Sequence, residues 1–156
     1  MTRLTDKDVK EISNTMDDLD KMLIEQTGES LMRIACRSAN ATPEIIGLDK
    51  FSVAVVPVTC GEGVINRFSE SVASICEHLG VAEAYVTENH DIAGFKEAIE
   101  LKADIIFMAD DLEFVAYNVK AFSCANNSFC TASGYVSALD SAVDGLVGKE
   151  VLVVGA

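Results

Sequence analysis

The sequence predicts an α/β fold in which a helical N-terminal segment precedes a parallel sheet. Residues 51–58 read FSVAVVPV, a nearly continuous apolar run that is typical of a strand covered on both faces. From this run onward, strand-like and helix-like segments alternate, as they do in parallel sheets with crossover helices. The chain has 156 residues, of which 49% are hydrophobic, so it can form one sizeable core.

The first fifty residues are predicted to be helical. Apolar residues within 5–27 recur at alternating steps of three and four, the spacing of one helical face, at Val9, Ile12, Met16, Leu19 and Leu23. Gly28 follows where a glycine that ends a helix is expected. A second helix is predicted over about 29–39, and 40–50 is the connector to the first strand.

The remaining elements follow from changes in the apolar period. A loop at 59–63 separates the first strand from a helix over 64–79. The later segments are predicted as a strand at 84–87, a helix at 91–101, a strand at 104–109, a helix at 111–121, a polar loop at 123–128 and a helix at about 130–146. This alternation predicts a parallel sheet with right-handed connections.

The final residues, VLVVGA, predict a buried strand over 150–154 that is followed by Gly155. Dinucleotide-binding units begin with a strand and then G-x-G-x-x-G, because the glycines let the backbone approach a pyrophosphate closely. Only the first glycine of that pattern is within the sequence, and many strands of parallel sheets also end in glycine. Gly155 is therefore a candidate cofactor-binding residue.

Composition disfavours several classes of partner and site. Lys and Arg number 12 against 25 Asp and Glu, and the formal charge of −13 disfavours nucleic acids and anionic membranes. The charged N-terminus lacks the apolar core of a signal peptide, and no apolar run is long enough to cross a bilayer, so we expect a cytoplasmic protein. Five cysteines without a C-x-x-C pair argue against disulfides and structural zinc, so no metal is expected.

The loop 59–63 (TCGEG) is the first candidate binding site, because ligands of parallel sheets bind beyond the carboxyl ends of the strands. Its glycines allow backbone N–H groups to converge on an anion at a helix N-terminus, while Glu62 favours a carboxylate or zwitterion over a phosphate. The candidate ligand contacts are Thr59, Cys60 and Gly61, and the thiol pKa is expected to fall at this position. The alternative is an ordinary turn capped by Thr59.

Asp110 and Asp111 follow the strand 104–109 and form the second candidate site. Because the carboxyl ends of parallel strands share one edge of a sheet, both are expected beside the loop 59–63. One of them is expected to cap the helix predicted next, and Asp111 suits that role better. Asp110 is then left to pair with a bound cation or amine, or to be solvated.

Three stretches of the sequence resemble the PylD family of pyrrolysine-forming dehydrogenases. They are 56–65 (VPVTCGEGVI) with Phe68 and Ser69, 108–111 (MADD) with Phe114, Ala116 and Asn118, and 125–127 (ANN) with Cys130 and Thr131. Further matches are Leu4, Thr5 and Asp8 near the start and 151–155 (VLVVG) at the end. The resemblance runs along the whole chain and covers the N-terminal part of a typical family member.

The resemblance implies a helical segment at 1–50, a Rossmann-like substrate domain at 51–128, a connecting helix at 129–148 and, at 149–156, the first strand of a truncated NAD-binding Rossmann domain. It also implies an oxidoreductase of pyrrolysine biosynthesis, acting as a homodimer. Using NAD, the family oxidises the terminal amine of lysine-Nε-3-methylornithine to an imine. The imine loses ammonia to leave an aldehyde, which closes into the pyrroline ring.

Several residue roles follow from the resemblance alone. Asp110 would anchor and orient the reactive amine, and Ala109 would offer backbone contacts at the same strand end. Leu4 would close the pocket from the N-terminal helix, with Asn126 as a further contact. Cys60 stands where the family has serine, and a thiol is a poorer hydrogen-bond donor than a hydroxyl.

The sequence leaves two classes of function open. The first is the substrate-side part of an NAD-dependent amine-oxidising enzyme, which we expect not to turn over as this chain alone, because positioning of the cofactor is a large part of catalysis. The alternative is a non-catalytic small-molecule-binding or regulatory α/β domain that self-associates through its last strand. A hydrolase that uses Cys60 would lack a histidine partner.

Overall fold

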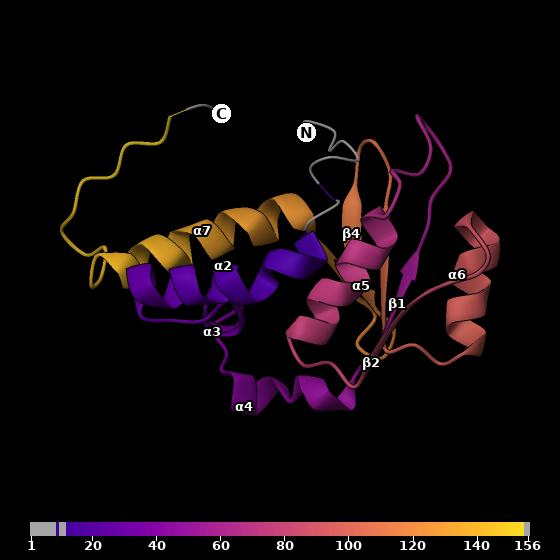
Figure 1. Ribbon diagram of the computed structural model, residues 1–156, viewed down its shortest axis with the longest axis horizontal. Helices are drawn as coiled ribbons and strands as arrows, with labels where there is room; N and C mark the ends of the chain where they lie inside the picture. The colour runs from indigo at the N-terminus through magenta and orange to yellow at the C-terminus, as the bar shows by residue number, and fades with distance from the viewer. Residues whose placement is uncertain (1–8, 10–11, 155–156) are drawn as a thin grey trace.

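The computed structural model describes residues 9 and 12–154, and its centre is a five-stranded sheet with helices on both faces (Figure 1). The strands are β1 (Ser52–Val56), β2 (Glu83–Val86), β3 (Ile105–Ala109), β4 (Phe114–Asn118) and β5 (Ser123–Asn126), and they lie in the order β2-β1-β3-β4-β5. β1 pairs in parallel with β2 and β3, whereas β4 and β5 are added antiparallel. The sheet is therefore mixed. Its parallel part was predicted from the sequence, and its antiparallel part was not.

The predicted helices are present, with the exception of 111–121, and their described ends lie within about four residues of the predicted ones. The start of the first helix, predicted at residue 5, lies outside the described residues. The helices are α2 (Ile12–Thr27), α3 (Leu31–Ser38), α5 (Phe68–His78), α6 (Asp91–Glu100) and α7 (Asn127–Ala142). The connector contains the short helices α4 (Pro43–Ile46) and η1 (Leu48–Lys50). Gly28, with a φ of +76°, donates its N–H to the carbonyl of Ile24 at 2.9 Å, and α2 ends just before it as predicted.

The two faces of the sheet carry separate cores. Ala54 and Val56 of β1 point to the face covered by α6, where they pack with Ala98. Val55 points to the opposite face and packs with Val72 of α5. Because neighbouring residues of a strand point to opposite faces, β1 is buried on both sides, as its unbroken apolar run predicted.

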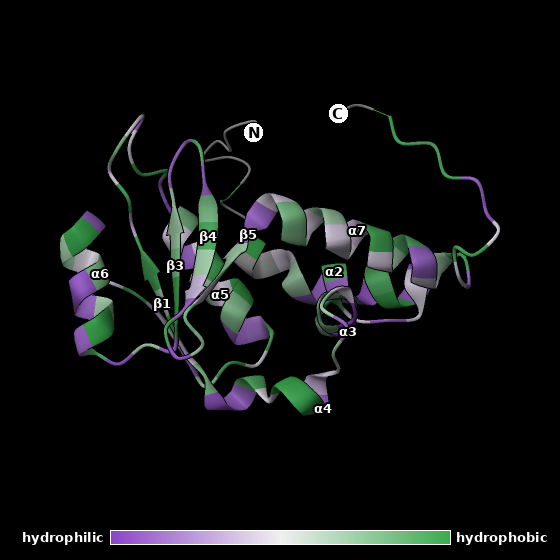
Figure 2. Ribbon diagram, turned by 180° about the vertical axis from the view of Figure 1, so that it is seen from behind, coloured by the Kyte–Doolittle hydropathy of each residue, from purple (hydrophilic) through white to green (hydrophobic). Residues whose placement is uncertain are grey.

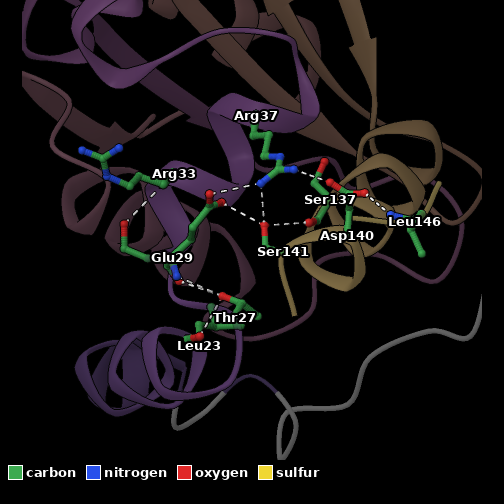
Figure 3. Close-up of polar contacts among 10 residues, drawn as sticks. Leu23, Thr27, Glu29, Arg33, Arg37, Ser137, Asp140, Ser141 and Leu146 are labelled. Atoms are coloured by element: carbon green, nitrogen blue, oxygen red, sulfur yellow. Dashed lines mark hydrogen bonds and ion pairs between the residues drawn. The ribbon is translucent and has the colours of Figure 1, made fainter. Parts of the chain in front are cut away.

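Helices from the two ends of the chain lie together beside the sheet (Figure 2). α7 packs against α2 and α3, and α2 also packs against α5. Arg37 of α3 links the helices: its guanidinium contacts Glu29 at 3.2 Å and the hydroxyl of Ser141 at 2.9 Å, and it forms an ion pair with Asp140 (Figure 3). The N-terminal segment and the connecting helix are thus one layer of the structure.

Three predictions from the apolar pattern were wrong. Residues 111–121 form β4 instead of a helix, because a tight turn, closed by the N–H of Asp110 on the carbonyl of Glu113 at 2.8 Å, returns the chain along β3. The segment expected as a polar loop contains β5, which pairs with β4. Residues 150–154 form no strand, since α7 leads the chain away from the sheet and no described strand lies beside them (Figure 2).

Candidate functional site

A cavity of about 480 Å³ lies at the carboxyl ends of β1 and β3, on the side of the sheet that α5 covers. Its wall is mainly apolar and includes Val55, Ile65, Phe68, Val72, Phe107 and Phe114. The polar side chains that line it are Glu62, Ser69, Ser71, Asp110, Asp111 and Asn127. No lysine, arginine or histidine is among the described residues of the lining, so the cavity suits a ligand with an apolar body and a positive charge.

Three phenylalanines make one wall of the cavity rigid. The ring centroids of Phe68 and Phe114 are 5.5 Å apart in an edge-to-face arrangement, and those of Phe107 and Phe114 are 6.0 Å apart. Such aromatic pairs add favourable contacts beyond the area that they bury. They connect α5, β3 and β4, so the antiparallel strand β4 contributes directly to the site.

Asp110 is held in the turn between β3 and β4. Its Oδ1 accepts the N–H groups of Leu112 and Glu113, each at 2.7 Å, and these bonds lower the pKa of Asp110 below its ordinary value. Its Oδ2 lies 3.8 Å from the sulfur of Cys60. The capping role was therefore assigned to the wrong aspartate, because the element that follows is a turn and a strand, and Asp110 caps it.

Asp111 instead connects the strand end to the glycine loop. Its Oδ2 accepts the N–H of Glu62 at 2.7 Å. On the other side of the loop, Asp91 at the start of α6 accepts the N–H of Thr59 at 2.7 Å and its hydroxyl at 2.5 Å. The loop and the two aspartates do lie together as predicted, but carboxylates of this chain already bind two of the loop amides expected to hold a ligand.

The thiol of Cys60 does not have the lowered pKa that its position suggested. Partial desolvation and the negative charge of Asp110 raise the pKa of this thiol, with further contributions from Asp91 and Asp111. The sequence interpretation failed because α5 begins only at Phe68, so no helix N-terminus lies directly after the loop. A protonated thiol is a weak nucleophile, which argues further against thiol catalysis.

The structure distributes the predicted site residues as follows. Ala109 and Asp110 line the cavity, while Thr59, Cys60 and Gly61 are beside its rim but are not part of its lining. Asn126 caps α7 by accepting the N–H of Ser128 at 2.9 Å, and its amide nitrogen donates to Glu113. Its neighbour in the chain, Asn127, is the one that lines the cavity. The other two candidates, Leu4 and Gly155, lie outside the described residues.

Sequence reasoning gave no role to several residues that line the cavity. Phe68 and Ser69 open α5 and face the sheet, and Phe114 begins β4. The available signal was their position, because the first turn of a helix after a strand-end loop lies at the ligand-binding edge of a parallel sheet. Phe114 could not be found in this way, because the apolar spacing of 111–121 predicts a helix.

Residues 9 and 12–154 carry neither a metal-binding cluster nor a membrane-spanning helix. No group of three or more histidine, cysteine, aspartate or glutamate side chains in this part of the chain is placed to hold a metal ion. No helix in the same residues is long and apolar enough to cross a membrane.

Comparison with known proteins agrees with the resemblance seen in the sequence. The family model described as "Pyrrolysine biosynthesis protein PylD, N-terminal domain" matches residues 8–125. Proteins named pyrrolysine synthase from Methanosarcina acetivorans and Methanosarcina barkeri are each 36% identical to this chain over 99% of its length. The chain spans 57% and 56% of the length of these relatives. On this evidence, the chain belongs to the PylD family and corresponds to its N-terminal domain.

Proposed function

We propose that this chain forms the substrate-binding part of a pyrrolysine-forming dehydrogenase, which oxidises the terminal amine of lysine-Nε-3-methylornithine. The two Methanosarcina relatives are named pyrrolysine synthase. The observation that carries the proposal is Asp110, a carboxylate fixed at the mouth of an apolar cavity that has no basic residue in its described lining. An aliphatic chain that ends in an ammonium group complements this arrangement.

In the proposed complex, Asp110 binds and orients the reactive amine. Two backbone N–H groups hold its Oδ1, and the thiol of Cys60 donates to its Oδ2 at 3.8 Å. A carboxylate oxygen has a second lone pair, so Oδ2 is the oxygen that we assign to the ligand. The lowered pKa keeps the carboxylate ionised but makes it a weak base. We therefore assign Asp110 to binding of the ammonium group and not to removal of its proton. The phenylalanine wall excludes water from the aliphatic part of the ligand.

The described residues do not fit the dinucleotide that the family resemblance implies. The loop 59–63 follows a strand and contains glycines, but Asp91 and Asp111 already accept two of its N–H groups, and Glu62 adds negative charge. A diphosphate would be repelled there. The proposed oxidation requires a hydride acceptor, and the family resemblance implies that it is NAD. We assign no contact with NAD to residues 9 and 12–154.

Calorimetric titration tests the proposal. We expect the chain to bind lysine-Nε-3-methylornithine, and to bind an analogue in which a methyl group replaces the terminal amine at least about tenfold more weakly, as for a lost charge-assisted hydrogen bond. Equal affinity for the two compounds would contradict the proposal. It would instead favour the alternative of a regulatory domain that recognises another feature of its ligand.

A further inference from the structure

We propose that Glu113 is a positioning residue for Asp110: by binding the side chain of Asn126, it fixes the turn that presents the Asp110 carboxylate to the ligand's ammonium group. This inference rests on the proposed function and adds to it a residue that acts without touching the ligand. Glu113 is exposed and is not part of the cavity lining. Its effect on binding therefore comes through its neighbours.

Glu113 closes the turn with both of its backbone groups. Its N–H donates to Oδ1 of Asp110 at 2.7 Å, and its carbonyl accepts the N–H of Asp110 at 2.8 Å. The N–H of Leu112 makes the second bond to Oδ1, but the side chain of Leu112 is well exposed and does not anchor the turn. The direction of the Asp110 carboxylate thus follows the position of Glu113.

A side-chain hydrogen bond extends beyond the point where the strand pairing ends. The last pair of β3 with β4 is Ala109 with Phe114, and the last pair of β4 with β5 is Val115 with Asn126. Glu113 lies beyond both pairs, and its Oε2 accepts the side-chain N–H of Asn126 at 2.5 Å. A hydrogen bond to a carboxylate is stronger than one between neutral groups, so this bond can hold the turn against the end of β5.

Asn126 is a firm anchor because it caps α7. Its side-chain oxygen accepts the N–H of Ser128 at 2.9 Å. α7 packs against α2 and α3, and its first residue, Asn127, lines the cavity. The bond between Asn126 and Glu113 therefore fixes the turn that carries Asp110 relative to the start of α7, and both of these elements line the same cavity.

A separate contact holds the turn from the side of the glycine loop, where Oδ2 of Asp111 accepts the N–H of Glu62 at 2.7 Å. Loss of the bond between Glu113 and Asn126 therefore loosens the turn without releasing it. Because this bond is exposed to solvent, it adds little to the free energy of unfolding. We expect its loss to appear in the hydrogen bonds of Asp110 and in ligand affinity.

The test uses variants that separate the bond from the charge. Glu113→Ala and Asn126→Ser each remove the bond, and serine still caps a helix, whereas Glu113→Gln removes the charge but keeps an oxygen that accepts the bond. Calorimetry with lysine-Nε-3-methylornithine gives the affinity of each variant. Carbon-13 NMR of the ligand-free chain gives the pKa of the Asp110 carboxyl.

We expect Glu113→Ala and Asn126→Ser each to weaken binding about fivefold, the double variant to be no weaker than either, and Glu113→Gln to bind as the wild type does. The pKa of Asp110 should rise toward its ordinary value of 3.8 in Glu113→Ala, because the two backbone N–H groups that lower it are held less firmly. Loss of the negative charge of Glu113 alone would shift this pKa in the opposite direction.

Wild-type affinity in Glu113→Ala, or weaker binding without a rise in the pKa of Asp110, would overturn the inference. Equal losses in Glu113→Ala and Glu113→Gln would assign the effect to charge instead. Losses that add in the double variant would show that Asn126 contacts the ligand itself, as the family resemblance implies. If the wild-type chain does not bind the ligand, the proposed function fails, and the pKa of Asp110 in Glu113→Ala still decides whether Glu113 positions this carboxylate.

Discussion

The carboxylate of Asp111 occupies the space that a side chain at Gly61 would need. A β-carbon built on Gly61 would lie 2.0 Å from Oδ2 of Asp111, the oxygen that accepts the N–H of Glu62 at 2.7 Å. Gly61 also has a φ of +69°, a backbone conformation that residues other than glycine rarely adopt. This contact joins the loop after β1 to the end of β3 and places the loop beside Asp110.

Because of this contact, Gly61→Ala should destabilise the chain more than an alanine substitution at a glycine that has a similar positive φ but no neighbouring atom. Gly80, with a φ of +86° and no atom within 4 Å of its would-be β-carbon, is the matched control. We expect Gly80→Ala to cost about 1 kcal/mol in the free energy of unfolding, and Gly61→Ala to cost about 1 kcal/mol more. Urea unfolding measures both. Equal losses would show that Asp111 does not restrict this position.

Asp91 is expected to keep the glycine loop ordered. Its carboxylate accepts two hydrogen bonds from Thr59, the hydroxyl and the N–H, and both lower the pKa of Asp91. In Asp91→Asn the residue still tolerates its φ of +52°, but the charge is lost. Amide hydrogen exchange at Thr59 should become faster, while Asp49→Asn, outside the site, should leave it unchanged. Unaltered exchange in Asp91→Asn would refute this role.

Asp104 is expected to stabilise the fold at neutral pH and to make its stability depend on acid. The ammonium of Lys120 and then the N–H of Ser52 lower the pKa of Asp104 below its ordinary value of 3.8. A lowered folded-state pKa gives stability that is present above the unfolded-state pKa and is lost as the pH falls through the folded-state value. Asp104→Asn should therefore lose about 1–2 kcal/mol at neutral pH and show a weaker loss of stability in acid. Parallel acid dependences of the two proteins would contradict the prediction.

Arg37 is expected to stabilise the packing of α7 against the N-terminal helices. Its guanidinium is only half-exposed and contacts Glu29, Asp140 and Ser141, so Arg37→Met should cost about 1–2 kcal/mol of unfolding free energy. Arg33 is the matched control, since its single partner is 3.9 Å away and both side chains are well exposed. Arg33→Met should change stability by less than about 0.5 kcal/mol. Equal effects in urea unfolding would show that the Arg37 cluster adds nothing specific.

The parallel half of the sheet could be predicted from sequence and the antiparallel half could not. The apolar run at 51–58 is too continuous for a strand with one solvent-exposed face, and this continuity identified β1 as a strand buried on both faces. In 111–121, apolar residues at 112, 115, 116 and 119 have helical spacing, although 114–118 pair with β3. Hydrogen bonds within a four-residue turn determine that this segment is a strand and not a helix. The spacing of apolar residues contains no information about these hydrogen bonds.

The position of the site was predictable in the same limited sense. That the loop 59–63 and Asp110 meet follows from the rule that parallel strands end at one edge of the sheet, and the structure confirms it. Which aspartate caps the turn, and that Asp91 binds Thr59, depend on side-chain directions that the sequence does not fix.

The most direct test measures the affinity of lysine-Nε-3-methylornithine for the wild-type chain, for Asp110→Asn and for the control Asp49→Asn, by calorimetry at neutral pH. Asp110→Asn keeps the size of the side chain and removes its charge, so binding should weaken about tenfold or more, while Asp49→Asn binds as the wild type does. Wild-type affinity in Asp110→Asn would contradict the central claim that this carboxylate binds the ligand's ammonium group.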